Sequence, residues 1–203
     1  MSIKIIVLLA EGFEEVEAIT PIDYLRRAGI EVHTAAVGLK ETGKGAYVTG
    51  SHNIQVRADT TTEELLTKNK FTPSEWDGVV CPGGLPGSDN LAASKETGVF
   101  LQAMADAGKW VCAICAAPAR VLAPLGILKG KRFTCYPGEE SKVTSSGSAG
   151  AEWKKDRVVI DGNIITSRGA GTAGEFSCAI IGALINEGEA KMLSEKVLLE
   201  QGK

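Results

Sequence analysis

The chain has 203 residues, of which 44% are hydrophobic and 23% charged, a balance that predicts one globular domain over residues 1–203 and excludes a disordered chain. A formal net charge of −3 without a basic cluster argues against direct binding of nucleic acid. The opening apolar run, residues 5–10, is too short to cross a bilayer and no cleavage-site pattern follows it, so we expect a cytoplasmic protein without a membrane anchor.

In the first half of the chain, short apolar strands alternate with helices. We expect strands over 3–10, 31–37 and 77–81, helices over 14–28 and 62–68, and a small hairpin from residues 47–48 and 54–56. Gly29 suits the end of the first helix, whereas Pro21 inside that helix predicts a break or a kink.

The second half continues the same alternation. We expect strands over 110–114, 132–134, 158–160 and 164–166, and helices over 94–108, 116–122, 172–186 and 189–200. Thr172 and Glu175 have the spacing of a capping box at the start of the third of these helices. Strands that alternate with helices predict an α/β fold, in which helices cover both faces of a mostly parallel sheet.

The five cysteines, at positions 81, 112, 115, 135 and 178, have no regular spacing, which argues against a disulfide framework. Cys112 and Cys115 do form a C-x-x-C pair. However, Cys112 lies inside the apolar run 110–114, whereas a redox pair normally opens a helix and a zinc site needs a second pair of ligands. We therefore interpret Cys112 as a small buried hydrophobic residue.

Cys115 stands where the predicted strand 110–114 turns directly into the predicted helix 116–122. This pattern is typical of a nucleophile elbow, a sharp turn that lifts one side chain above the sheet and requires small residues two positions to either side. Ala113 and Ala117 meet that requirement. The sequence therefore predicts Cys115 as a reactive residue at the carboxyl edge of the sheet, where such folds place their functional crevice.

The predicted elbow also supplies groups that stabilise an anion. Free N–H groups at the start of a helix are expected to lower the pKa of the Cys115 thiol. The backbone N–H of Ala116 and that of Gly84, in a Pro-Gly-Gly turn, are candidates for an oxyanion hole. The alternative that spacing leaves open is that Cys115 is simply buried between strand and helix.

Spacing does not identify a partner for Cys115. His33 falls in the second predicted strand and His52 in the hairpin, so no cysteine–histidine pair can be assigned. Three glutamates crowd residues 14–17, and a carboxylic acid beside a thiolate would be held in its protonated form. The alternative is that these acids have no role in chemistry and are present only because the positive end of the first helix favours negative charge.

Several motifs, taken in order, resemble the ThiJ/PfpI superfamily, in particular its DJ-one branch. They are Glu-Gly-Phe-Glu-Glu-Val-Glu at 11–17, the helix end at 23–30, Pro-Gly-Gly at 82–84, Ala-Ile-Cys-Ala-Ala-Pro at 113–118 and Thr-Ser-Arg-Gly-Ala-Gly-Thr at 166–172. The resemblance runs from about residue 3 to about residue 200. It implies a flavodoxin-like sandwich that usually forms a homodimer and needs no metal or organic cofactor.

The resemblance also implies roles for individual residues. The reactive cysteine corresponds to Cys115, and its protonated hydrogen-bond partner corresponds to Glu17. The oxyanion donors correspond to the backbone of Gly84 and Ala116. The substrate pocket is expected to include Gly83, Tyr136 and Arg168.

The chain departs from the superfamily's pattern at four positions. Protease-like members have a histidine where this chain has Ala116, so peptidase activity is disfavoured. Many DJ-one relatives have a histidine where this chain has Tyr136, which removes the usual proton shuttle. His52 stands where relatives often carry an anion-binding arginine, and Ala170 replaces a common proline.

Two functions follow from the resemblance. The first is a cofactor-independent glyoxalase, with deglycation of proteins and nucleotides as a further activity, in which Cys115 and Glu17 act on small α-oxoaldehydes such as methylglyoxal or glyoxal. The second is a sensor of oxidative stress and a holdase chaperone that works through oxidation of Cys115 without physiological turnover.

Overall fold

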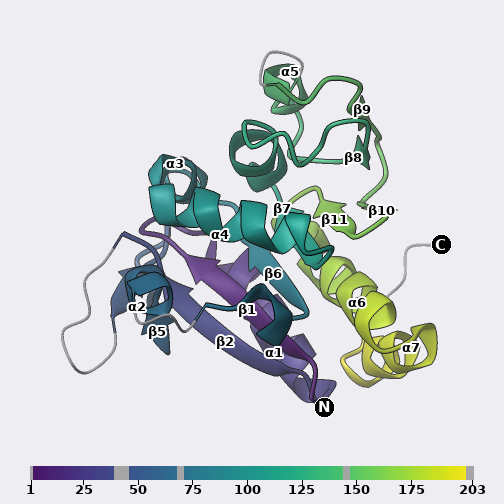
Figure 1. The fold of residues 1–203 in the computed structure, drawn as a ribbon. Helices are drawn as coiled ribbons and strands as arrows, with labels where there is room; N and C mark the ends of the chain where they lie inside the picture. The colour runs from purple at the N-terminus through teal and green to yellow at the C-terminus, as the bar shows by residue number, and fades with distance from the viewer. Residues whose placement is uncertain (1, 39–45, 68–70, 144–146, 200–203) are drawn as a thin grey trace.

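The computed structural model describes residues 2–38, 46–67, 71–143 and 147–199 (Figure 1). Two predicted helices, 62–68 and 189–200, each end one residue outside these ranges. Among the described residues, none of the helices combines the length and the apolar character needed to cross a membrane.

A seven-stranded sheet forms the centre of the molecule, in the order β10-β11-β7-β6-β1-β2-β5. Its strands are β1 (Lys4–Leu9), β2 (Glu31–Ala36), β5 (Thr60–Thr61), β6 (Gly78–Cys81), β7 (Trp110–Ile114), β10 (Val158–Asp161) and β11 (Ile164–Ser167). Every neighbouring pair runs parallel except β10 with β11, which is antiparallel. The mostly parallel sheet predicted from the alternation of elements is confirmed.

Helices cover both faces of this sheet (Figure 1). One face packs against α1 (Glu15–Arg27) and α6 (Ala173–Leu184), with α7 (Glu187–Lys196) packed on α6. The other face packs against α2 (Thr62–Thr67), α3 (Gly87–Ala93) and α4 (Lys95–Asp106). Successive residues of β1 alternate between the two cores, because strand side chains point to opposite faces. The result is the flavodoxin-like sandwich that the resemblance implied.

Two small units lie outside the main sheet. The predicted hairpin is confirmed as β3 (Tyr47–Thr49) paired antiparallel with β4 (Gln55–Arg57). The predicted strand at 132–134 is β8 (Arg132–Phe133), which pairs with β9 (Glu152–Trp153) in a separate two-stranded sheet. Together with α5 (Glu140–Val143), β8 and β9 form an excursion beyond the end of the main sheet (Figure 1).

The break expected at Pro21 does not occur, because α1 is continuous from Glu15 to Arg27. A proline in a helix interior costs one backbone hydrogen bond and steric strain, about 3 kcal/mol. In α1 the proline belongs to a buried face with Ala18, Ile22 and Leu25. Tertiary packing of that face therefore outweighs the local penalty.

Two further expectations about helix starts are corrected. The α-helix predicted over 116–122 is instead a turn followed by one π-helical turn, Pro118–Leu122, in which Ala123 N donates to Pro118 O at 3.0 Å. The capping box of Thr172 and Glu175 is absent, because Thr172 Oγ1 bonds Gly169 and the Glu175 carboxylate pairs with Arg157. At the second place a tertiary ion pair, Arg157 with Glu175, takes the carboxylate that the capping box would need.

Candidate active site

Cys115 lies at the carboxyl edge of the sheet, where loops from neighbouring strands converge. The strands β11, β7, β6 and β1 are consecutive in the sheet, so the loops that follow them are also neighbours. The loop after β6 contains Gly83 and Gly84, and the loop after β1 leads into α1. This edge of the sheet, where a crevice is expected, is therefore formed by segments far apart in sequence.

The backbone at Cys115 has the strained conformation of an elbow. Its φ of 64° is in the left-handed region, which costs a non-glycine residue about 1 kcal/mol or more. Two hydrogen bonds fix the turn, because Cys115 N donates to Ser167 O at 2.9 Å and Cys115 O accepts from Tyr136 N at 2.8 Å. The predicted elbow geometry is confirmed. The interpretation of Cys112 as a buried residue of the preceding strand is also confirmed, since its exposure is 0%.

Among the acids of the opening motif, it is Glu17 that contacts Cys115. Glu17 is 1% exposed, its carboxyl oxygen Oε2 accepts from Gly83 N at 2.9 Å, and its side chain is hydrogen-bonded to Cys115. Gly83 makes this approach possible, because a Cβ there would lie 2.5 Å from the Cβ of Cys115 and would overlap the Glu17 carboxyl. The structure thus brings together Cys115, Glu17 and Gly83 from three separate elements.

Burial shifts the protonation of this pair. It raises the pKa of Glu17 from 4.5 to about 7; hydrogen bonds from Cys115 and Gly83 oppose the shift, and the charge of Glu14 adds to it. Burial also raises the pKa of the Cys115 thiol, as do the charge of Glu17 and the hydrogen bond to it. Glu17 is therefore the member of the pair that can give up or accept a proton near neutral pH.

The expectation that the helix start lowers the pKa of Cys115 is consequently wrong in its net direction. The backbone N–H groups of Gly84 and Ala116 do hydrogen-bond Cys115 and do lower its pKa, but burial and Glu17 outweigh them. Both predicted oxyanion donors nevertheless stand at the sulfur. Gly84 has a φ of 92°, and a Cβ on it would lie 2.5 Å from Glu14 N, so only glycine fits this donor loop.

The other predicted pocket residues lie at different distances from the pair. The Tyr136 ring flanks Gly169, since a Cβ built there would lie 3.5 Å from Tyr136 Cδ2 and 3.8 Å from Glu17 Oε1. Tyr136 is 54% exposed, as a residue at the mouth of a pocket would be. Arg168 follows β11 as expected, but its guanidinium donates to Lys155 O at 3.1 Å. A role for either side chain in binding substrate stays a prediction.

Arg120 is a structural residue that no motif or spacing in the sequence indicates. It follows the elbow and forms a bidentate pair with Glu139, with Nε–Oε2 at 2.7 Å and Nη2–Oε1 at 3.0 Å. Its Nη1 also donates to Asp89 of α3 at 2.6 Å. Because the partners are 19 and 31 positions away, spacing carries no signal of this link between α3, the elbow and the loop that begins at Tyr136.

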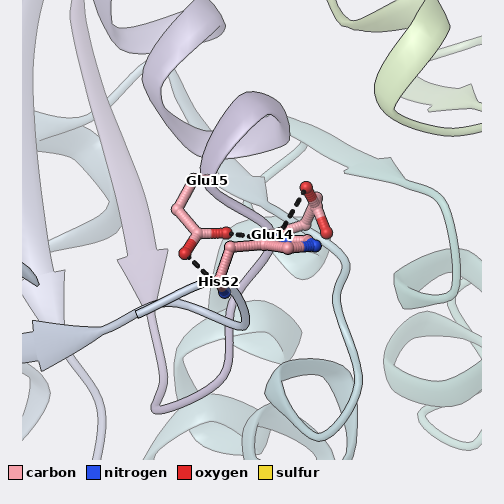
Figure 2. Close-up of side chains that lie close together, drawn as sticks. All are labelled: Glu14, Glu15 and His52. Carbon is pink, nitrogen blue, oxygen red and sulfur yellow. Dashed lines mark hydrogen bonds and ion pairs between the residues drawn. The ribbon is translucent and has the colours of Figure 1, made fainter. Parts of the chain in front are cut away.

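Neither histidine is hydrogen-bonded to Cys115 in the described contacts, in agreement with the absence of an assignable cysteine–histidine pair. His33 bonds Glu31 at 2.7 Å. His52 lies beside the two other glutamates of the opening motif, Glu14 and Glu15 (Figure 2). These three side chains are the described group that has the ligand atoms for a metal ion.

Comparison with known proteins gives a consistent result. The model of the DJ-1/PfpI family matches residues 3–183. Protein DJ-1 homolog B of Arabidopsis thaliana is 37% identical over 196 residues, which are 97% of this chain and 41% of that protein. The chain spans less than half the length of this relative and of Protein DJ-1 homolog A, of which it covers 46%. A Pyrococcus horikoshii protein named Deglycase PH1704 is 34% identical over 165 residues, 81% of this chain and 89% of that protein.

Solved structures agree with these sequence matches. Drosophila melanogaster DJ-1beta superposes with a TM-score of 0.85 at 36% identity, covering 99% of this chain and 100% of that one. A structure described as oxidized Toxoplasma gondii DJ-1 also has a TM-score of 0.85, at 30% identity, covering 98% of this chain and 100% of that one.

Proposed function

The chain belongs to the DJ-1/PfpI family, and on that premise we propose that it is a cofactor-independent enzyme that converts small α-oxoaldehydes, such as methylglyoxal, without glutathione. The observation that carries this proposal is the buried Glu17–Cys115 hydrogen bond beneath two backbone N–H groups. A thiol, a carboxyl that titrates near neutral pH and an anion-binding pair are the groups that such a reaction requires.

In the first step the Cys115 sulfur attacks the aldehyde carbon. A C–S bond forms, the thiol proton passes to the ionised Glu17, and the carbonyl electrons move to oxygen. The backbone N–H groups of Gly84 and Ala116 bind the resulting oxyanion. Because the pKa of Glu17 is raised to about 7, its carboxylate is a much better base for this proton than an ordinary glutamate.

In the second step Glu17 moves a proton between neighbouring carbons. It returns its first proton to the oxyanion, removes the hydrogen from the carbon bonded to sulfur and delivers it to the adjacent ketone carbon. The proton of the new hydroxyl passes to the former ketone oxygen, which leaves a thioester beside a hydroxyl group. Water then hydrolyses the thioester and frees Cys115. One methylglyoxal and one water give one lactate, so no oxidant or reductant is consumed.

Hydrolysis of a glycated amine would use the same sulfur adduct, with the amine as leaving group. Support for this extension comes from the relative named Deglycase, which is 34% identical to this chain. In that reaction the Cys115 sulfur displaces the amine from the carbinolamine carbon. The C–S bond forms as the C–N bond breaks, the thiol proton passes through Glu17 to the amine, and the same hemithioacetal then follows the steps above.

The test is lactate formation from methylglyoxal in the absence of glutathione. We expect Cys115→Ser and Glu17→Gln to lose on the order of a hundredfold or more in turnover, the range typical of a lost nucleophile or general base. Cys112→Ala, which removes the other thiol of the C-x-x-C pair, is the matched control and should keep turnover within about threefold of wild type. Wild-type rates in Cys115→Ser or Glu17→Gln would refute the proposal.

A second candidate function is oxidation sensing and chaperone activity through Cys115. The buried acid at the sulfur favours it, because a protonated carboxyl can hydrogen-bond the oxygens added by peroxide and halt oxidation at the sulfinate. A relative has been described in an oxidized form. Intact mass after graded peroxide separates the two functions: gain of two oxygens at Cys115 together with negligible aldehyde turnover would favour the sensor.

We further propose that the chain forms a homodimer. The first turns of α1 expose Val16 (47%) and Ile19 (40%), two apolar side chains that a second copy could cover. Light scattering during size-exclusion chromatography tests this, since a mass of twice 21.3 kDa is expected.

A further inference from the structure

A second group of polar side chains converges between the start of α1 and the β3–β4 hairpin (Figure 2). Glu14 immediately precedes α1, Glu15 is the first residue of that helix, and Ser51 and His52 come from the turn of the hairpin. One ligand atom from each of Glu14, Glu15 and His52 lies within 4.8 Å of the other two. Since about 37 positions separate helix and hairpin, this convergence is a product of the fold.

The distances within the group are those of a small coordination sphere. His52 Nδ1 lies 3.0 Å from Glu15 Oε2 and 3.6 Å from Glu14 Oε1. Ser51 Oγ lies 3.2 Å from Glu14 Oε2, 3.3 Å from Glu15 Oε2 and 3.0 Å from His52 Nδ1. Ligands about 2.0–2.1 Å from a tetrahedral Zn²⁺ are about 3.4 Å apart, so the two His52–carboxylate distances already lie within about half an ångström of that spacing, while the two carboxylates lie within 4.8 Å of each other.

The Glu15 carboxylate is already held as a metal-binding carboxylate would be. Its Oε1 accepts from the backbone N–H of His52 at 2.7 Å and of Ile54 at 3.4 Å, which leaves Oε2 facing the group. Gly50 makes room for it, because a Cβ there would overlap the Glu15 carboxyl. Such outer hydrogen bonds orient first ligands and are typical of metal centres.

The charges and the access are also suitable. Two carboxylates face one imidazole, so the group keeps excess negative charge even when His52 is protonated. The Glu15 side chain is 7% exposed, whereas that of His52 is 68% exposed and gives an ion a route from solvent. The pair His33–Glu31 provides a contrast, since His33 Nε2 lies 2.7 Å from one carboxylate and pairs with no second carboxylate of the described part of the chain.

We propose that Glu14, Glu15 and His52 bind one divalent cation of the zinc class, with Ser51 or water as the fourth ligand. The set of one imidazole nitrogen and carboxylate oxygens is one that Zn²⁺ accepts and that Ca²⁺ or Mg²⁺, which prefer oxygen alone, would not select. This site is separate from the Cys115–Glu17 pair and does not depend on the proposed enzyme activity.

The test is Zn²⁺ binding to untagged, chelator-stripped protein, followed by calorimetry and by NMR of the histidine ring nitrogens. We expect one equivalent of Zn²⁺, a large shift of the His52 signals and none of the His33 signals. Affinity should fall at least tenfold in His52→Ala and in Glu14→Gln, and should be unchanged in His33→Ala and Cys115→Ser. Circular dichroism verifies folding, and Glu14→Gln, which leaves the backbone-anchored Glu15 intact, keeps the test valid if His52→Ala unfolds.

Three results would overturn the proposal. One is the absence of Zn²⁺ binding, which would leave the group as an ion pair of protonated His52. Another is binding of equal strength in His52→Ala and Glu14→Gln. The third is binding that is lost in Cys115→Ser, because the ion would then sit on the reactive thiol. Co²⁺ as a probe separates the last case, since a thiolate ligand adds an intense near-ultraviolet charge-transfer band.

Discussion

Cys112 and Cys115 are three positions apart and belong to the same strand–turn segment, yet they differ in exposure, backbone conformation and hydrogen-bond partners. Cys112 is a residue of β7 with 0% exposure, and burial raises the pKa of its thiol. Cys115 has a φ of 64°, is partly accessible and contacts an acid and two backbone N–H groups.

The reactivity proposed for Cys115 therefore rests on its position and its hydrogen-bond partners rather than on a low thiol pKa. Burial raises the pKa of both thiols. Only Cys115 has a hydrogen-bonded carboxyl, Glu17, whose own pKa has been raised towards neutrality. The fold thus supplies a proton acceptor for one cysteine of the pair and leaves the other in the core.

The largest expected effect is on the reaction of the two cysteines with iodoacetamide. We expect Cys115 to react at least a hundredfold faster than Cys112 in the folded protein, because Cys112 is reached only through unfolding. The Cys115 rate should rise with pH through about 7, since Glu17 accepts the thiol proton only after it has lost its own. Peptide mass spectrometry of samples quenched between pH 5 and 9, with a chelator present, measures both rates.

Glu17→Gln is the matched variant for this experiment. It keeps a hydrogen-bonding side chain but cannot accept the proton, so the inflection near pH 7 should disappear and the rate at pH 7.5 should fall about tenfold or more. An unchanged pH profile in Glu17→Gln would show that Cys115 ionises independently of Glu17.

The next effect is on the free energy of unfolding, which the buried Glu17 carboxylate lowers above neutral pH. A carboxyl whose folded pKa of about 7 exceeds its unfolded value of 4.5 favours the folded state below pH 4.5 and loses that contribution as the pH rises to 7. A shift of this size corresponds to about 3 kcal/mol, an upper estimate for the penalty above pH 7. We expect urea unfolding to show that Glu17→Gln is more stable than wild type at pH 8 and that the difference shrinks towards pH 5. A difference that does not change with pH would contradict this origin.

The sequence carried enough information to predict the elbow but not its electrostatics. The strand at 110–114, the small neighbours and the turn at Cys115 follow from local pattern, and the family resemblance selected Glu17 among three acids. The net direction of the Cys115 pKa could not be obtained in this way. It depends on burial by segments that meet only in three dimensions, including Gly83, which lies 66 positions from Glu17.

The same limit explains the errors elsewhere in the fold. The break at Pro21 and the capping box at Thr172 were inferred from local rules, and in the structure tertiary contacts decide both. The Arg120 link and the Glu14–Glu15–His52 group have no local signal at all, because each joins residues from separate elements. Long, periodic or strongly apolar segments were predictable, since their pattern reports burial directly.

Replacement by glycine should change stability in opposite directions at the two cysteines. Cys115→Gly relieves the left-handed strain and is expected to stabilise the fold by about 0.5–1 kcal/mol, at the cost of the reactive thiol. Cys112→Gly removes a fully buried side chain from a central strand and should cost about 2 kcal/mol. Chemical unfolding of both variants measures the difference. Cys115→Ala is the control, because it removes the sulfur but keeps the strain.

The smallest expected effect is on the rate of proton movement at the mouth of the site. Tyr136 stands where the resemblance implies a histidine, and its backbone N–H, which donates to Cys115 O at 2.8 Å, does not depend on the side chain. Tyr136→His should therefore preserve the elbow while adding a group that titrates near neutral pH next to Glu17. We expect turnover of methylglyoxal to rise about two- to threefold at pH 7, whereas Tyr136→Phe should leave it nearly unchanged. Equal rates in both variants would mean that Glu17 alone carries the proton and that no second proton shuttle is needed. Glu17 would then be sufficient to distinguish Cys115 from Cys112.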